Sequence, residues 1–137
     1  MLLWRRDRLA QAVSLYKARV TQIWSSLDRQ FLDDDDPRLS VEVKYDPLAI
    51  AQALTDVIRQ ETGWRRFFQE HALPYIEVCH EDFVSDPAAQ GKRLLEALDI
   101  DPVGVALPAP RLERQGGADN DAMVREFREL LGQPAAQ

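Results

Sequence analysis

Two short apolar segments, separated by long stretches of helical periodicity, constrain the fold of this chain more than any other feature. Residues 2–5 and residues 73–79 have the apolar character of buried strands. Strands joined by a long helical crossover normally lie parallel in one sheet, and a parallel sheet needs further strands and helices on both faces. We therefore expect a mostly helical α/β fold with a partial three-layer parallel sheet, whose other strands lie N-terminal to residue 1 or on a partner chain.

The apolar spacing predicts four helices. They cover residues 8–25, 46–71, 85–98 and 119–131. Asp46 is the expected cap of the second helix, and Pro47 stands at its first position, where its missing N–H does no harm. Residues 27–45 and 99–118 are expected to be mostly irregular. The apolar side chains expected on the inner faces of the last two helices are Leu94, Leu95, Leu98, Met123, Val124, Phe127, Leu130 and Leu131.

The single cysteine and the acidic charge balance limit the expected environment and partners. Cys79 has no second cysteine to pair with and lies in an apolar run, so we expect a buried thiol and a reducing, cytoplasmic location. The net charge of −6 disfavours a nucleic-acid partner, although a basic helix start at residues 5–8 keeps that alternative open. No apolar run is long enough for a membrane span, and residues 1–4 do not resemble a signal peptide.

No metal site and no phosphate loop are expected. His71 and His80 fall in different predicted elements without zinc-ligand spacing. The acidic run at residues 33–36 lacks the spacing and the glycine of a calcium loop. Gly91-Lys92-Arg93 fails as a phosphate loop, because the first glycine of that motif would fall on Asp86 and the segment lies inside a predicted helix.

Two further groups of residues are expected to have structural roles. Glu81 and Asp82 are adjacent and should point apart on a strand or turn, so we expect capping and ion pairing rather than a shared-proton dyad. The aromatic residues within 64–68 have helical spacing and should be core or interface. Arg65 and Arg66, beside them, are expected to be solvated with packed stems.

Arg6 and Ser14 form the first candidate binding site. Arg6 follows the first predicted strand, and Ser14 comes eight positions later on the next helix. Ligands of parallel sheets bind beyond the carboxyl ends of the strands. A guanidinium offers a phosphate two parallel hydrogen bonds, and a serine hydroxyl adds a neutral donor. On spacing alone, a basic helix start with a solvated polar face remains an alternative.

An ordered set of segments resembles a known enzyme family. Residues 4–15, Trp-Arg-Arg-Asp-Arg-Leu-Ala-Gln-Ala-Val-Ser-Leu, resemble the 3′-phosphate-binding strand and helix of sulfotransferases, in particular of the bacterial trehalose-type family. The resemblance continues in order along almost the whole chain. Its later pieces are residues 45–50, 64–68, 78–87, 112–115 and 124–128.

The resemblance implies a nucleotide site and an acceptor class. Arg6 would contact the 3′-phosphate of 3′-phosphoadenosine-5′-phosphosulfate and Ser14 would share it. Arg114 and Gln115 lie where the tail of similar proteins returns to the nucleotide. The sulfuryl group would move to a carbohydrate hydroxyl, as in trehalose or a glycolipid, and residues 27–45 would help to shape the acceptor side. His80 departs from the tyrosine usual at its position.

The resemblance also implies what kind of piece this chain is. Residues 1–137 would be a single domain, the C-terminal part of a sulfotransferase domain with the parallel sheet of P-loop nucleotide kinases. Similar enzymes hold the 5′-phosphosulfate and a catalytic acidic residue in an N-terminal strand–loop–helix, which these residues do not contain. We therefore expect the chain to be inactive alone. A homodimer is one expected assembly. The alternative is a non-catalytic α/β interaction module that pairs through an exposed strand edge.

Overall fold

The computed structural model of the chain describes residues 1–105 and 117–132 and divides into two compact units. Unit 1 comprises Met1–Asp7 and Ile58–Ala109, and unit 2 comprises Arg8–Val57 and Pro110–Gln137. The elements, in chain order, are β1 (Leu2–Trp4), α1 (Arg8–Thr21), α2 (Ser26–Gln30), the 3-10 helix η1 (Pro37–Ser40), α3 (Pro47–Glu70), β2 (Glu77–Cys79), α4 (His80–Ser85), α5 (Pro87–Ala97) and α6 (Ala118–Leu130). The expectation of a mostly helical α/β chain is confirmed.

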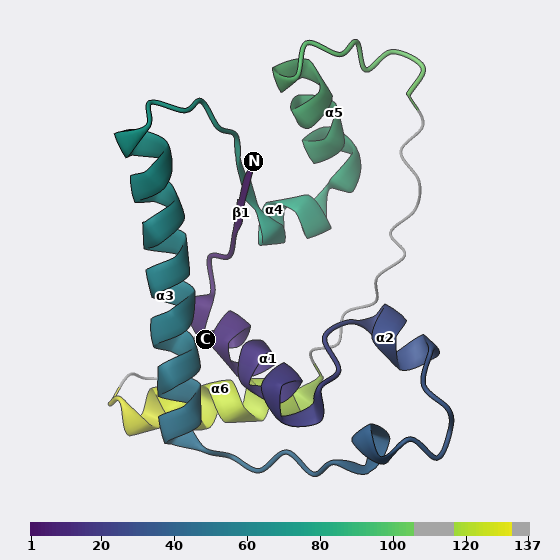
Figure 1. Cartoon of the computed structure of the whole chain (residues 1–137), viewed down its shortest axis with the longest axis vertical. Coiled ribbons are helices and arrows are strands. Elements are labelled where there is room, and N and C mark those ends of the chain that lie inside the picture. Colours follow the sequence, from purple (N-terminus) through teal and green to yellow (C-terminus); the bar gives the residue numbers. More distant parts are fainter. Residues whose placement is uncertain (106–116, 133–137) are drawn as a thin grey trace. The chain divides into compact units, whose positions relative to one another are not determined.

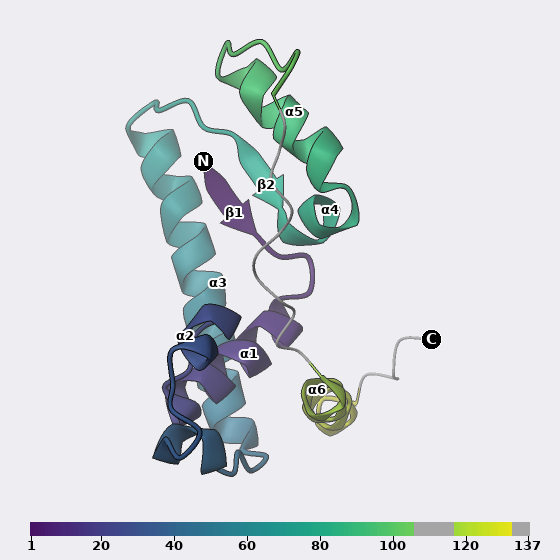
Figure 2. The same ribbon diagram turned by 90° about the vertical axis from the view of Figure 1, so that its right-hand side faces the viewer.

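The sheet of unit 1 consists of β1 and β2, which run parallel as predicted. Figure 2 shows the two arrows side by side and pointing the same way. Leu2 pairs with Glu77 and Trp4 with Cys79. Leu2 and Val78 are buried on this sheet, while Leu3 is 58% exposed. β2 is shorter than predicted: its ladder with β1 covers Glu77–Cys79, and just before it the Ile76 carbonyl oxygen accepts from the Leu2 N–H at 2.8 Å.

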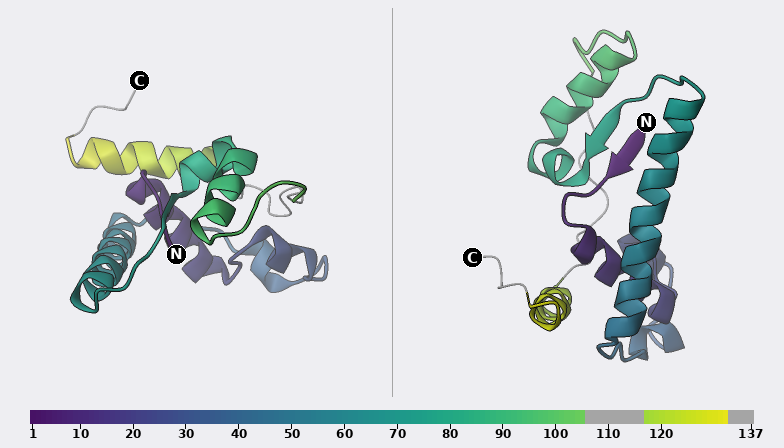
Figure 3. Two further views of the ribbon diagram at one scale, coloured as in Figure 1. Left: turned by 90° about the horizontal axis from the view of Figure 1, so that it is seen from above. Right: turned by 90° about the vertical axis from the view of Figure 1, so that its left-hand side faces the viewer.

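Two short helices follow β2 in unit 1. α4 starts directly where the strand ends, as the right-hand view of Figure 3 shows. The sequence did not predict α4, because six residues are too few to display an apolar period. α5 begins where predicted: the Asp86 carboxylate accepts a hydrogen bond from the Ala89 N–H at 2.9 Å, and Pro87 occupies the first turn. Leu98, expected on the inner face, is instead 62% exposed at the end of this helix.

The aromatic residues at the end of α3 form a connected cluster in unit 1. Trp64 contacts Phe67 and Phe68, and Phe68 stacks on Tyr75 with ring centroids 4.5 Å apart. Arg65 was expected to be solvated with a packed stem; its side chain is 34% exposed, but the sequence did not predict its ion pairs. Its guanidinium pairs with two carboxylates, those of Glu61 and Glu77, and lies over the Trp4 ring. This arginine therefore links α3 to both strands.

Unit 2 has a core built from α1, α6 and the first turns of α3. Figure 1 shows α6 lying against α1. The buried residues of this core are Ala12, Val13, Tyr16, Ile50, Ala53, Met123, Val124 and Phe127. The Tyr16 hydroxyl also donates to the Lys44 carbonyl oxygen at 2.6 Å, which fixes the chain before α3. Leu130 and Leu131 were predicted to face inward, but they are 65% and 56% exposed because they lie beyond the core cluster.

The segment between α1 and α3 is more ordered than predicted. α1 ends at Thr21 rather than Ser25, because Gln22 takes a left-handed backbone conformation with φ of 58°. Ser25 and Asp28 then form a reciprocal capping box that starts α2. Asp36 caps η1: its carboxylate accepts from the Arg38 N–H at 2.9 Å, and Pro37 follows it. The segment is mostly irregular, as predicted, but the prediction missed these two short helices, whose starts are marked in the sequence by Ser25-x-x-Asp28 and Asp36-Pro37.

Candidate functional site

The candidate site in unit 1 lies at the carboxyl end of the two-stranded sheet. Because Trp4 and Cys79 are paired at the last position of the parallel ladder, the residues that follow each strand lie opposite one another. Arg5 and His80 are in contact there, with 3.0 Å between Nη2 and Nε2. One position further along, the backbone N–H of Arg6 donates to Glu81 Oε2 at 3.0 Å. The residues that follow the two strands thus remain paired beyond the end of the sheet, through contacts to the side chains of His80 and Glu81.

The Arg6 side chain carries an exposed positive charge at this end of the sheet. Its guanidinium is 61% exposed and donates from Nη2 to both carboxylate oxygens of Asp82, at 2.9 and 3.2 Å. The hydrogen bond that Arg6 donates to Asp82, and then the negative charge of Asp82, raise the pKa of Arg6 above its usual value. Nε and Nη1 make no hydrogen bond to other residues in the described part of the chain. Arg6 therefore stays charged and offers further donors to an anion.

Glu81 fixes the backbone that carries Arg6. Burial by itself raises the pKa of Glu81, but hydrogen bonds from the Arg6 N–H, the Cys79 thiol and the Glu81 and Asp7 N–H groups outweigh it and lower this pKa to about 2. The thiol lies 3.0 Å from Glu81 Oε2, and Cys79 is buried, as the sequence predicted. Glu81 is therefore a permanent anion that ties the turn after β1 to the end of β2.

Ser14 belongs to unit 2, where it lies on α1 beside a small polar network. The Asn120 side-chain amide donates to Ser14 Oγ at 3.4 Å and accepts a hydrogen bond from Lys17 Nζ at 2.6 Å. Asn120 is only 8% exposed, so this network is part of the packing between α1 and α6. The Ser14 hydroxyl accepts in this contact, and a serine hydroxyl also carries one hydrogen that it can donate.

The remaining predictions concern the tail, the Gly91-Lys92-Arg93 segment and the ion pairing of Asp82. Arg114 and Gln115 lie outside the described residues. Residues 91–93 lie in a helix, as predicted: Gly91 is buried in α5 and Lys92 pairs with Glu96 at 3.8 Å. Ion pairing at Asp82 was predicted, but its partner was not. That partner follows from the strand register, which the sequence alone does not specify.

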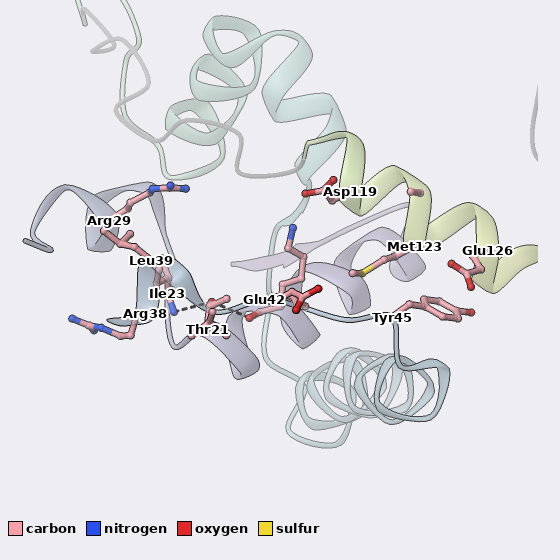
Figure 4. Close-up of a pocket in the computed structure, with 14 residues that line it drawn as sticks. Thr21, Ile23, Arg29, Arg38, Leu39, Glu42, Tyr45, Asp119, Met123 and Glu126 are labelled. Carbon is pink, nitrogen blue, oxygen red and sulfur yellow. Dashed lines mark hydrogen bonds between the residues drawn. The ribbon is translucent and has the colours of Figure 1, made fainter. Parts of the chain in front are cut away.

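Unit 2 also contains an open hollow of about 560 Å³ between the start of α6 and the segment before α3. Figure 4 shows its wall near Thr21, whose hydroxyl donates to the Lys17 carbonyl oxygen and accepts from the Ile23 N–H. Charged groups of both signs alternate with apolar side chains around it. The lining residues are Lys17, Thr21, Ile23, Arg29, Arg38, Leu39, Val41, Glu42, Val43, Tyr45, Asp119, Ala122, Met123 and Glu126.

In the described part of the chain, no three His, Cys, Asp or Glu side chains gather as a metal site would require. Among the helices described above, none is long and apolar enough to cross a membrane.

Comparison with known proteins gives a consistent result over most of the chain. The family model for Stf0 sulphotransferase matches residues 1–130. A trehalose 2-sulfotransferase of Mycobacterium tuberculosis is 32% identical over 124 residues, which are 90% of this chain and 43% of that protein. A trehalose 2-sulfotransferase of Mycolicibacterium smegmatis gives the same identity and coverage. The chain thus spans less than half the length of these two relatives.

Proposed function

The chain belongs to the Stf0 sulphotransferase family, as its ordered motifs predicted, and from this premise we propose that it binds the 3′-phosphate of 3′-phosphoadenosine-5′-phosphosulfate through Arg6. The observation that supports the proposal is the exposed Arg6 guanidinium at the carboxyl end of a parallel strand. Ligands of parallel sheets bind at this end. A guanidinium matches the geometry of a phosphate better than an ammonium does.

Ser14 is proposed as a second, weaker ligand of the same phosphate. This part rests on the family motif, in which a serine follows the arginine at an eight-residue offset, as Ser14 follows Arg6. A serine hydroxyl can donate to a phosphate oxygen, which is compatible with the role. Arg114 and Gln115 are proposed, from the sequence resemblance alone, to return to the nucleotide from the tail.

The proposed reaction is sulfuryl transfer from this nucleotide to a carbohydrate hydroxyl. The acceptor class is supported by the two relatives, both described as trehalose 2-sulfotransferases. Because the chain spans 43% of their length, we propose that it is the C-terminal part of a longer sulfotransferase domain with a P-loop-type sheet. Arg6 and Ser14 bind and orient the far end of the donor; neither is assigned a role in the transfer itself.

The open hollow of unit 2 is proposed as the place where the sugar lies. It combines carboxylates that can accept from sugar hydroxyls with apolar side chains and the ring of Tyr45. Saturation-transfer NMR with trehalose tests this assignment. The signal should appear with the wild type and fall in Glu42→Gln, whereas an unchanged signal would place the sugar elsewhere.

Binding of adenosine 3′,5′-bisphosphate, the product nucleotide, is the appropriate test of the donor site. Calorimetric titration should show binding by the wild type, a loss of about 10- to 100-fold in Arg6→Ala, and a loss of about 2- to 10-fold in Ser14→Ala. Arg66→Ala is the matched control, because Arg66 is also exposed and paired with a carboxylate, that of Glu70. No binding by the wild type would overturn the proposal. No binding together with a stable dimer under the same conditions would favour an interaction module instead.

A further inference from the structure

The ion pair between Arg6 and Asp82 occupies the part of the guanidinium that a phosphate needs. Both hydrogen bonds to Asp82 leave from Nη2. A guanidinium presents two edges on which paired N–H groups point the same way, and both edges include Nη2; the third edge is blocked by the side chain's own methylene. A phosphate that binds Arg6 through two parallel hydrogen bonds must therefore share Nη2 with Asp82 or displace it.

The surroundings allow Asp82 to leave Nη2 without disturbing the turn. The backbone of Arg6 is held separately, by the carboxylate of Glu81. Asp82 itself is anchored through the main chain of α4, where its carbonyl oxygen accepts from the Asp86 N–H at 3.1 Å. Its side chain is 48% exposed, so the carboxylate can move into water. The pair can open while both backbones stay in place.

The carboxylates beside Arg6 oppose the binding of a further anion. Two cations, Arg5 and Arg6, stand beside two carboxylates, Glu81 and Asp82, so the four side chains carry no net charge. A phosphate monoester brings up to two negative charges next to the Asp82 carboxylate. Repulsion between these groups opposes binding, and it adds to the loss of the existing ion pair.

We propose that Asp82 is a resident counter-ion of Arg6 that sets the affinity of this site for a nucleoside 3′-phosphate. The inference rests on the proposed donor site and adds to it a residue that weakens phosphate binding. Neutralising Asp82 leaves Nη2 available and removes the repulsion. The Asp82→Asn variant should therefore bind adenosine 3′,5′-bisphosphate about 5- to 10-fold more tightly than the wild type, equivalent to about 1.0–1.4 kcal/mol.

The experiment is a calorimetric titration of this chain with two nucleotides. Adenosine 3′,5′-bisphosphate carries the phosphate in question, and adenosine 5′-phosphate lacks it. We expect the gain in Asp82→Asn for the first nucleotide, and less than a twofold change for the second. Asp82→Glu keeps the charge and should show no gain. Glu96→Gln removes one negative charge elsewhere in unit 1, at a residue paired with Lys92, and should also leave the affinity unchanged.

A gain in affinity is an informative readout, because a misfolded variant loses binding rather than improving it. The gain should shrink in 0.5 M salt, which screens exposed charges, and it should vanish in the double variant Arg6→Ala/Asp82→Asn. Weaker binding in Asp82→Asn would show that Asp82 orients Arg6 and would overturn the inference. So would an equal gain for both nucleotides, or a gain in Glu96→Gln.

The two proposals fail in different ways. Wild-type binding that depends on Arg6 but does not rise in Asp82→Asn would overturn this inference alone. No binding by either the wild type or Asp82→Asn would overturn the proposed donor site and this inference with it.

Discussion

Replacing Glu81 by Gln removes the charge that holds the turn after β1, while keeping the size of the side chain. In the native protein the Glu81 carboxylate accepts from the Arg6 N–H and the Cys79 thiol, both at 3.0 Å. Burial raises its pKa, but these and neighbouring hydrogen bonds lower it overall from 4.5 to about 2. A glutamine oxygen can keep one such bond but offers no charge to the others.

The size of the effect follows from the pKa. A depression of about 2.5 pKa units corresponds to an upper limit of about 3 kcal/mol of stability. Glu81 is partly exposed, so screening by solvent lowers this figure. We expect Glu81→Gln to lower the free energy of unfolding by about 1–2 kcal/mol at pH 7.

The pH dependence gives a second, independent check. Because the pKa of Glu81 is lower in the folded chain than in the unfolded chain, its contribution is full above about pH 5 and is lost as the pH falls toward 2. Urea unfolding followed by circular dichroism should therefore show the difference between wild type and Glu81→Gln at pH 7, and a smaller one near pH 3. Equal stability at pH 7, or a difference that does not change with pH, would refute the reasoning.

Three further substitutions test the packing and capping. Phe127→Ala should lower the free energy of unfolding by about 3–5 kcal/mol because the ring is 4% exposed, whereas Leu130→Ala, at an exposed position, should change it by less than about 0.5 kcal/mol. Asp86→Ala should cost about 1 kcal/mol through loss of the α5 cap, visible in urea unfolding. Asn120→Ala leaves the ammonium of Lys17 without its acceptor and should cost about 1–3 kcal/mol by the same measurement. Unchanged stability in any of the three destabilising variants would contradict the contact assigned to it.

Much of the helical structure was predictable because its signals are local. Pro47 and the Asp86-Pro87 pair mark helix starts through capping and a fixed backbone angle, and the structure begins α3 and α5 there. The burial of Cys79 also followed from its apolar neighbours. Such features depend on a few consecutive residues, so no tertiary information was needed.

The candidate site was only half predictable, because its partners are set by tertiary register. The sequence identifies Arg6 through its place after a strand. It does not reveal that Asp82 will pair with Arg6, since this depends on how β1 aligns with β2. Arg65 shows the same limit: helical spacing made it look solvated, and only the fold brings Glu77 within reach.

Recognition of a nucleoside 3′-phosphate by Arg6 can be measured as the ratio of two affinities. The dissociation constants of adenosine 3′,5′-bisphosphate and adenosine 5′-phosphate are measured for the wild type and for Arg6→Ala. A charge-assisted pair of hydrogen bonds predicts a wild-type preference for the bisphosphate of about 10-fold or more, which falls to near unity in Arg6→Ala. An equal preference in both proteins would show that the 3′-phosphate binds elsewhere and that Arg6 does not recognise it.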